Sequence, residues 1–202
     1  MTTKLESHIK NYTDAKNAFY ASLKALDLDY IDLYIIHAPW PWSEMGKDCK
    51  EGNVSAYKAL EEVYQKGLAK GIGVSNFDVE NLDYLINHSN ITPHVNQIAY
   101  FIGLDQEETI SYSNNHQILI EAYSPLGIGF LLENPVIKEV ALKYQKSSAQ
   151  LCIRYLLQKN TLPLPKTVNK DRMYENADLE FDISSKDMDI LDQVKGDPRR
   201  WE

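Results

Sequence analysis

The sequence is poor in cysteine and contains no long apolar run. Cys49 and Cys152 are the only cysteines among 202 residues, and they form neither a C-x-x-C pair nor a regular framework. Isolated cysteines are typical of a reducing compartment, so we expect two plain thiols and a cytoplasmic protein. No stretch reaches the roughly eighteen apolar residues of a membrane span, and the amino terminus, MTTKLESHIKNY, lacks the apolar centre of a signal peptide.

The sequence also lacks an excess of positive charge. Its 21 Lys and Arg residues are outnumbered by 29 Asp and Glu residues, which gives a formal net charge of −8. Nucleic acid is therefore not an expected partner. The five histidines form no H-E-x-x-H motif and no cluster with cysteine, so no metal site is expected. No G-x-G-x-x-G motif occurs, which argues against a doubly wound dinucleotide fold.

What the chain does have is a regular alternation of short apolar strands and amphipathic helices. The segment IDLYIIH is almost wholly apolar and rich in β-branched residues, as expected of a strand that is buried on both faces. Alternating strands and helices predict a parallel α/β sheet covered by helices, in one domain over residues 1–202. The expected strands lie within residues 2–5, 31–37, 70–77, 95–100, 118–127 and 162–166.

Helix boundaries can be predicted from residues that cap helix ends. Several side chains can satisfy the free backbone N–H groups of a first helical turn. A weak helix is expected near residues 105–113, and a last barrel-type helix from Asp171 to about Leu179. The predicted capping residues are Thr13 or Asp14, the Asn134-Pro135 pair, Ser147 with Gln150, and Ser184 with Asp187.

Polar residues follow or end the expected strands. In a parallel barrel the carboxyl ends of all strands meet at one face, where ligand sites lie. Each residue has an ordinary alternative, and on position alone His37 is more often a core histidine bonded to a backbone carbonyl. Together they predict a pocket with amide groups, an aromatic surface and a cationic end. The residues are His37, Ser75, Asn76, Gln97, Tyr123, Ser124, Lys166 and Thr167.

Such a pocket suits a nicotinamide nucleotide. Asn76 and Gln97 could bind the carboxamide of the nicotinamide, and Tyr123 could stack on the ring. Lys166 and Arg172 lie six residues apart across the start of a helix. Two cations and the free backbone N–H groups of a helix start are suited to a phosphate.

Five segments resemble, in order and approximate spacing, segments of the aldo-keto reductase family. They are LDYIDLYIIHAPWP, KGIGVSNF, VNQIAY, EAYSPLG and LPKTVNKDRMYENADLEF, and the resemblance covers essentially the whole chain. It implies a (β/α)8 barrel of the TIM type. It also implies NADPH-dependent reduction of an aldehyde or ketone to an alcohol.

The resemblance further implies roles for individual residues. His37 would orient or polarise the substrate carbonyl, and Trp40 and Trp42 would lie at the substrate mouth, with simple loop packing as the alternative for both. The remaining residues would hold NADPH: Ser75, Asn76 and Gln97 at the carboxamide, Tyr123 on the ring, Ser124, Leu126 and Gly127 along the pyrophosphate, Lys166, Thr167 and Arg172 at the 2′-phosphate, and Glu175 and Asn176 at the adenosine.

The chain departs from the family pattern at the catalytic tetrad of Asp, Tyr, Lys and His. Lys4 in TTKL is the candidate lysine, which would lower the pKa of a neighbouring tyrosine so that it acts as the acid. The aspartate and tyrosine belong to a segment upstream of TTKL. Tyr12, Tyr20 and Tyr30 lie in or beside the first expected helix, the wrong place to replace that tyrosine.

We therefore expect an amino-terminally truncated member, lacking the first two strands and part of the third, as a split or misannotated reading frame would produce. An incomplete barrel has open edges, here at residues 1–5 and 162–166, through which chains can self-associate. Loss of two strands would also leave Ile35, Ile72 and Ile98 partly uncovered.

Three interpretations of function remain open on the sequence. The first is a reductase of small carbonyl compounds with doubtful activity in this chain. The second is a non-catalytic module that binds NADP or a partner protein. The third is a gene remnant without a stable fold.

Overall fold

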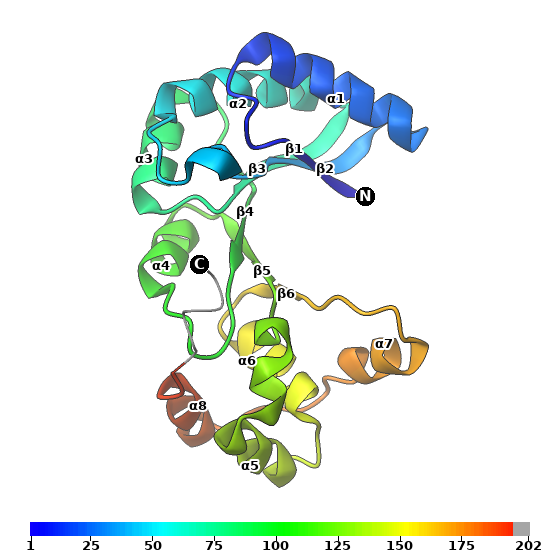
Figure 1. Ribbon diagram of the computed structural model, residues 1–202, viewed down its shortest axis with the longest axis vertical. Helices are drawn as coiled ribbons and strands as arrows, with labels where there is room; N and C mark the ends of the chain where they lie inside the picture. The colour runs from blue at the N-terminus through cyan, green and yellow to red at the C-terminus, as the bar shows by residue number, and fades with distance from the viewer. Residues whose placement is uncertain (196–202) are drawn as a thin grey trace. The chain divides into compact units, whose positions relative to one another are not determined.

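The computed structural model describes residues 1–195, which form two compact units (Figure 1). The first unit comprises Met1–Gln97 and Glu108–Leu119, and the second comprises Ile98–Glu107 and the described residues from Ile120 onward. Within residues 1–195 no helix has the length and apolar character needed to cross a membrane. Cys49 and Cys152 are both free thiols, as the sequence predicts.

The strands of the first unit pair in parallel in the order in which they occur along the chain. They are β1 (Thr2–Leu5), β2 (Ile31–Ile36), β3 (Ala69–Ser75) and β4 (Val95–Ala99), whose last two residues are assigned to the second unit. Gly73 in β3 lies against β4 so closely that an added Cβ would be 2.4 Å from the carbonyl oxygen of Val95. Only glycine allows this approach, so Gly73 helps to fix the pairing that sets Ser75 opposite Gln97.

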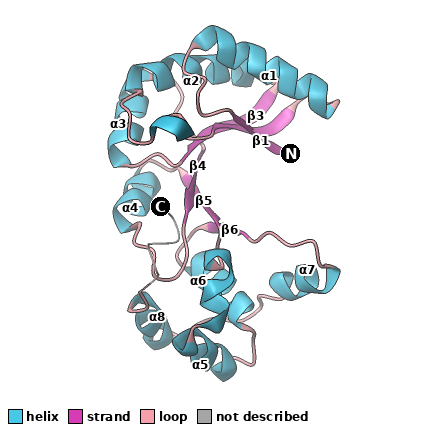
Figure 2. Cartoon of the chain, viewed as in Figure 1, coloured by secondary structure: helices cyan, strands magenta, loops and turns pink. Residues whose placement is uncertain are grey.

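Three helices of the first unit lie on one side of its strands (Figure 2). They are α1 (Tyr12–Leu26), α2 (Lys50–Gln65) and α3 (Val79–His88); a 3-10 turn, η1 (Trp42–Glu44), precedes α2, and α4 (Glu107–Asn115) follows β4. Their apolar faces and the strands form a single core, whose largest fully buried side chains include Phe19, Tyr34, Tyr57, Leu60 and Ile72.

The expectation that Ile35, Ile72 and Ile98 are partly uncovered is wrong. Ile35 and Ile72 have no exposed surface and Ile98 is 3% exposed. Ile72 belongs to the core formed between the strands and the helices, so its burial does not depend on further strands.

The capping residue of α1 is also not the one expected. The helix begins at Tyr12, and Asn11 is its cap because the Asn11 side chain accepts a hydrogen bond of 2.9 Å from the backbone N–H of Asp14. Thr13 and Asp14 lie inside the first turn, so they cannot be the cap. The predicted caps of three later helices, by Asn134, Ser147 and Ser184, are confirmed, including the capping box with Gln150.

The second unit contains the parallel pair β5 (Leu119–Tyr123) and β6 (Leu162–Leu164), apart from Leu119 itself. Its helical segments are η2 (Gly127–Glu133), α5 (Pro135–Lys143), α6 (Ser148–Gln158), α7 (Lys170–Ala177) and α8 (Ser185–Asp192). The strand expected at 162–166 is thus shorter, and the helices expected at 105–113 and 171–179 are displaced by one or two residues.

A series of ion pairs joins the α5–α6 region of the second unit to the segment that follows α7. Four basic side chains each meet one aspartate. The pairs are Lys146–Asp178 at 2.6 Å, Lys143–Asp187 at 2.7 Å, Lys159–Asp192 at 2.7 Å, and Arg154–Asp182. Asp187 is 8% exposed and also accepts a hydrogen bond of 2.6 Å from the Tyr144 hydroxyl. The hydrogen bonds from Lys143 and Tyr144 lower the pKa of Asp187 to about 2.

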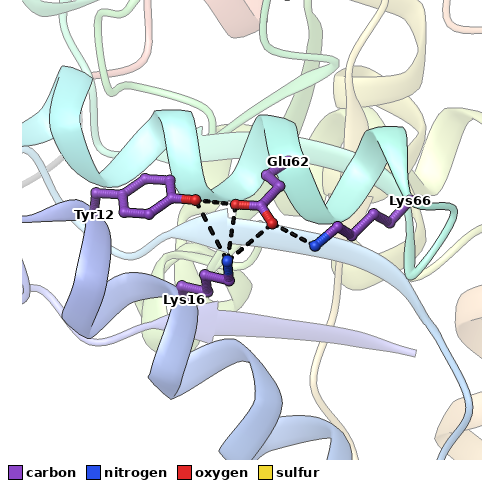
Figure 3. Close-up of polar contacts among 4 residues, drawn as sticks. All are labelled: Tyr12, Lys16, Glu62 and Lys66. Carbon is purple, nitrogen blue, oxygen red and sulfur yellow. Dashed lines mark hydrogen bonds and ion pairs between the residues drawn. The ribbon is translucent and has the colours of Figure 1, made fainter.

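Two neighbouring glutamates on α2 act differently. Glu62 faces Tyr12 and Lys16 of α1, and Lys66 at the end of α2 also contacts its carboxylate (Figure 3). Hydrogen bonds from Lys66, Tyr12 and Lys16 lower the pKa of Glu62 to about 2. Lys66, Lys16 and Glu62 remain partly exposed, so solvent weakens these pairs.

Glu61 is 4% exposed and points toward the loop after α3. It accepts hydrogen bonds from the backbone N–H groups of Asn90, at 2.6 Å, and Ile91, at 2.7 Å. A buried carboxylate thus holds the connection between α3 and β4.

We predict that Glu61→Ala lowers the free energy of unfolding by about 1–3 kcal/mol, because two backbone donors lose a charged acceptor. Glu61→Gln, which keeps one acceptor oxygen, should lose less. Urea denaturation followed by circular dichroism measures both. Lys58→Ala, at an exposed position of the same helix, is the control and should change little. A Glu61→Ala protein as stable as the control would contradict the role given to this carboxylate.

We predict that Asp187→Asn destabilises the protein at neutral pH and that its deficit vanishes in acid. A carboxyl whose pKa is lower when folded stabilises the fold above its unfolded pKa, and loses that contribution as pH falls through the folded value. For Asp187 this window runs from the ordinary value of 3.8 down to about 2. Denaturation midpoints of the two proteins should converge across it, whereas a constant difference would exclude the charge as the cause.

Candidate functional site

Polar side chains from three strands of the first unit form one connected network. Lys4 on β1 donates a hydrogen bond from Nζ to Oε1 of Gln97 on β4. The Ser75 hydroxyl, at the end of β3, donates to the backbone carbonyl of Gln97 at 2.7 Å, and the backbone N–H of Asn76 donates to the same carbonyl at 3.0 Å. The parallel register brings these residues together, as the sequence analysis expects for strand ends.

Asn76 connects this network to His37. Its backbone is left-handed, with φ of 61°, which turns the chain sharply after β3. Its Nδ2 donates to the His37 carbonyl oxygen at 3.0 Å and to the Ser75 hydroxyl at 3.1 Å. Ser75 has no exposed surface, so it supports its neighbours from within the protein.

His37 follows β2 directly, and its backbone N–H donates to the carbonyl of Leu5 at 3.1 Å. Its side chain is half-buried, and burial together with the nearby charge of Lys4 lowers its pKa below the ordinary 6.5. The imidazole is therefore neutral at neutral pH and keeps one N–H donor. The imidazole of His37 and the indole of Trp42 pack edge to face, with their ring centres 5.5 Å apart.

The loop after His37 is held by residues that the sequence analysis does not identify. Lys10 donates to the carbonyl of Ala38 at 2.7 Å, Asn53 donates to that of Pro39 at 2.8 Å, and Ser7 accepts a hydrogen bond from the backbone N–H of Trp42. Nothing in the local pattern marks these residues, because they contact the loop only through the tertiary fold.

Both tryptophans of this loop lie near His37 along the chain, but Trp42 is the one whose ring contacts it. Trp40 is half-buried and reaches Trp42 with a ring-centre distance of 5.7 Å. The structure thus places Trp40 behind Trp42 in the series of rings that begins at His37.

In the second unit a tight turn follows β5. Tyr123 ends the strand, and burial raises the pKa of its hydroxyl. Ser124 and Gly127 both have positive φ, and the N–H of Gly127 donates to the carbonyl of Ser124 at 2.9 Å. A Cβ on Gly127 would lie 2.5 Å from the Phe130 ring, so this turn requires glycine. Leu126, inside the turn, is partly buried.

The remaining predicted nucleotide contacts lie on or before α7, which has no buried residue. Lys166, Arg172 and Glu175 are exposed, and Thr167 and Asn176 are half-buried. Among the ion pairs of residues 1–195, none uses Lys166 or Arg172. One detail differs from expectation: the N–H of Arg172 is not free, because it donates to the Asn169 side chain at 3.0 Å.

A surface hollow of about 450 Å³ contains none of the predicted residues. It is lined by Asp48, Cys49, Lys50, Glu51, Gly52 and Tyr84, where the start of α2 faces α3. The candidate site therefore does not include this hollow.

Comparison with known proteins identifies the family. The model of the aldo/keto reductase family matches residues 2–195. The chain is 39% identical over 200 residues to a glyoxal reductase of Bacillus subtilis (strain 168), covering 98% of the chain and 69% of that protein. It spans about two thirds of the length of the curated relatives that it matches, 66% in the case of the uncharacterized oxidoreductase YtbE.

Solved structures that resemble this chain are also aldo-keto reductases. An aldo/keto reductase from Brucella melitensis has a TM-score of 0.86 at 36% identity, over 95% of this chain and 72% of that one. A Bombyx mori aldo-keto reductase in complex with NADP has a TM-score of 0.86 at 32% identity, over 95% and 66%. These similarities confirm the parallel α/β fold of the barrel type, and they show that the chain belongs to the aldo/keto reductase family of oxidoreductases.

Proposed function

We propose that the chain supplies the NADP(H) site and part of the catalytic site of a reductase that converts small aldehydes or ketones to alcohols. The observation that carries this proposal is the network joining Lys4, Gln97, Ser75, Asn76 and His37 at the carboxyl ends of β1–β4. A relative is named for reduction of glyoxal, a small dicarbonyl compound, which supports this class of substrate.

His37 is the proposed residue for orienting the substrate. Its backbone is held at both ends, by Leu5 and by Asn76, so the ring projects from a fixed position. A neutral imidazole N–H can donate a hydrogen bond to a carbonyl oxygen, and that bond strengthens as negative charge develops on the oxygen. The Lys4 ammonium adds a positive charge nearby, which favours the same charge development.

The residues of the second unit fit the other parts of a dinucleotide. A turn that excludes side chains at Gly127 suits the approach of a pyrophosphate to the backbone, and the Lys166 and Arg172 cations suit an additional phosphate. NADPH, when bound, supplies the hydride for the reduction. Ser75, Asn76, Gln97 and Tyr123 are the proposed contacts for its nicotinamide, and Ser124, Leu126, Thr167, Glu175 and Asn176 are proposed for the rest.

A non-catalytic nucleotide-binding module is the second candidate. The favouring observation is that the Lys4 ammonium is already bonded to the Gln97 side chain. Binding of NADPH without turnover distinguishes this candidate from a reductase. Self-association through β1, which lies at the end of the strand order, stays a prediction.

We predict that the chain binds NADPH more tightly than NADH and that Arg172→Ala removes most of this preference. A charge-assisted hydrogen bond to phosphate contributes roughly 1.5–3 kcal/mol, which is about tenfold or more in Kd. Fluorescence titration with both nucleotides measures the ratio. Lys170→Ala, which removes a neighbouring cation from α7, is the matched control. Equal affinities for the two nucleotides, or an unchanged preference in Arg172→Ala, would contradict the assignment.

We predict that the purified 202-residue polypeptide reduces small aldehydes very slowly or not at all. His37 can polarise a carbonyl, but a positioned general acid typically contributes another factor of about 10²–10⁴. NADPH consumption with a generic aromatic aldehyde measures the rate. Turnover near about 10 s⁻¹, a usual value for enzymes, that is lost in His37→Ala would show that another residue donates the proton.

A further inference from the structure

Lys10 and Asn53 form a compact polar cluster behind the loop 38–42. Lys10 donates from Nζ to the carbonyl of Ala38 and to Oδ1 of Asn53, both at 2.7 Å. Asn53 is 2% exposed, and its Nδ2 donates to the carbonyl of Pro39 at 2.8 Å. Two consecutive loop carbonyls are thus bound by two side chains that are also bonded to each other.

Burying the charged end of Lys10 is energetically unfavourable, and the surrounding residues are arranged to allow it. Burial lowers the pKa of Lys10 to about 8, and carbonyl and amide oxygens replace water around its ammonium group. Gly52 lies so close that an added Cβ would be 2.8 Å from Cβ of Lys10 and 2.9 Å from its carbonyl oxygen. The start of α2 therefore fits against Lys10 only because residue 52 lacks a side chain.

The loop that this cluster holds carries the aromatic surface next to His37. The ring centres of Trp42 and His37 are 5.5 Å apart and those of Trp40 and Trp42 are 5.7 Å apart, and the backbone N–H of Trp42 donates to the Ser7 hydroxyl at 3.3 Å. The loop is only five residues long, from Ala38 to Trp42, so fixing its first two carbonyls limits where both indoles can lie.

We propose that Lys10 and Asn53 are positioning residues, which hold the loop Ala38–Trp42 so that Trp42 packs against His37 and the two indoles form the wall that selects the carbonyl substrate. The part concerning substrate rests on the proposed function. The part concerning the loop does not, and it is tested without nucleotide or turnover.

The test uses fluorescence excited selectively in tryptophan, in a Trp201→Phe background in which Trp40 and Trp42 are the only tryptophans. A protonated imidazole quenches an indole that it touches, so emission should fall as pH drops through the pKa of His37, below 6.5. Lys4 is the charged group that already affects this histidine, and it is unchanged in every variant. This fall in emission is the quenching step. His37→Gln should abolish the quenching step, which would show that the His37 imidazole causes it.

Three variants loosen the loop by different means. Lys10→Met removes the two hydrogen bonds that the Lys10 ammonium donates, to Ala38 and to Asn53. Asn53→Asp keeps an acceptor for Lys10 but places an oxygen against the Pro39 carbonyl. Gly52→Ala removes no polar group, yet its methyl group displaces Lys10. The expected result is a reduction of the step by about twofold or more in all three, whereas Lys58→Met, at an exposed position of α2, retains it.

Lys10→Arg provides the rescue, because it restores a cationic donor and should recover part of the step. A full step in Asn53→Asp and Gly52→Ala, each folded by circular dichroism, would overturn the proposal. A reduced step in a protein that binds no NADPH would support the loop assignment and contradict only the proposed function. In any preparation with measurable turnover, Asn53→Asp should raise KM for an aromatic aldehyde more than it lowers kcat.

Discussion

Parallel pairing of β1 to β4 is the constraint on which the first half of the site depends. Because the strands run in the same direction, the residues that end them meet at one edge of the sheet. The register then decides which side chains can meet. Ser75 lies opposite Gln97, and a slip of one residue would turn one of them to the other face. The bare backbone at Gly73 permits the close contact between β3 and β4 that maintains this register.

Once aligned, the polar residues satisfy much of their hydrogen-bonding capacity with one another. The Gln97 carbonyl accepts from both Ser75 and the backbone of Asn76, and Asn76 in turn supports the carbonyl of His37. Groups that are fixed in this way need little reorganisation when charge develops beside them, which is the physical basis of electrostatic preorganisation. The same bonding keeps His37 at the end of a rigid strand instead of on a mobile loop.

Charged side chains serve different purposes in different parts of the chain. In the second unit, Lys143, Lys146, Arg154 and Lys159 are paired with aspartates and connect helices to the segment after α7. Lys166, which precedes α7, and Arg172, which lies within it, are exposed and take no part in the ion pairs of the described residues. In the first unit, the Lys10 ammonium binds the carbonyl oxygen of Ala38 and the amide oxygen of Asn53, so it stabilises a loop without a carboxylate partner in these contacts.

The sequence by itself determined the strand and helix order, most capping residues, the family, and the identity of the strand-end residues from His37 to Gln97. It did so because periodicity, capping and strand-end position are local properties. Only the tertiary structure decided that Asn11 caps α1, that Ile35 and Ile72 are buried, and that Trp42, not Trp40, contacts His37. It also revealed Lys10 and Asn53, which are 43 residues apart. No local pattern could have paired them, because their contact exists only where α2 packs against the segment that follows β1.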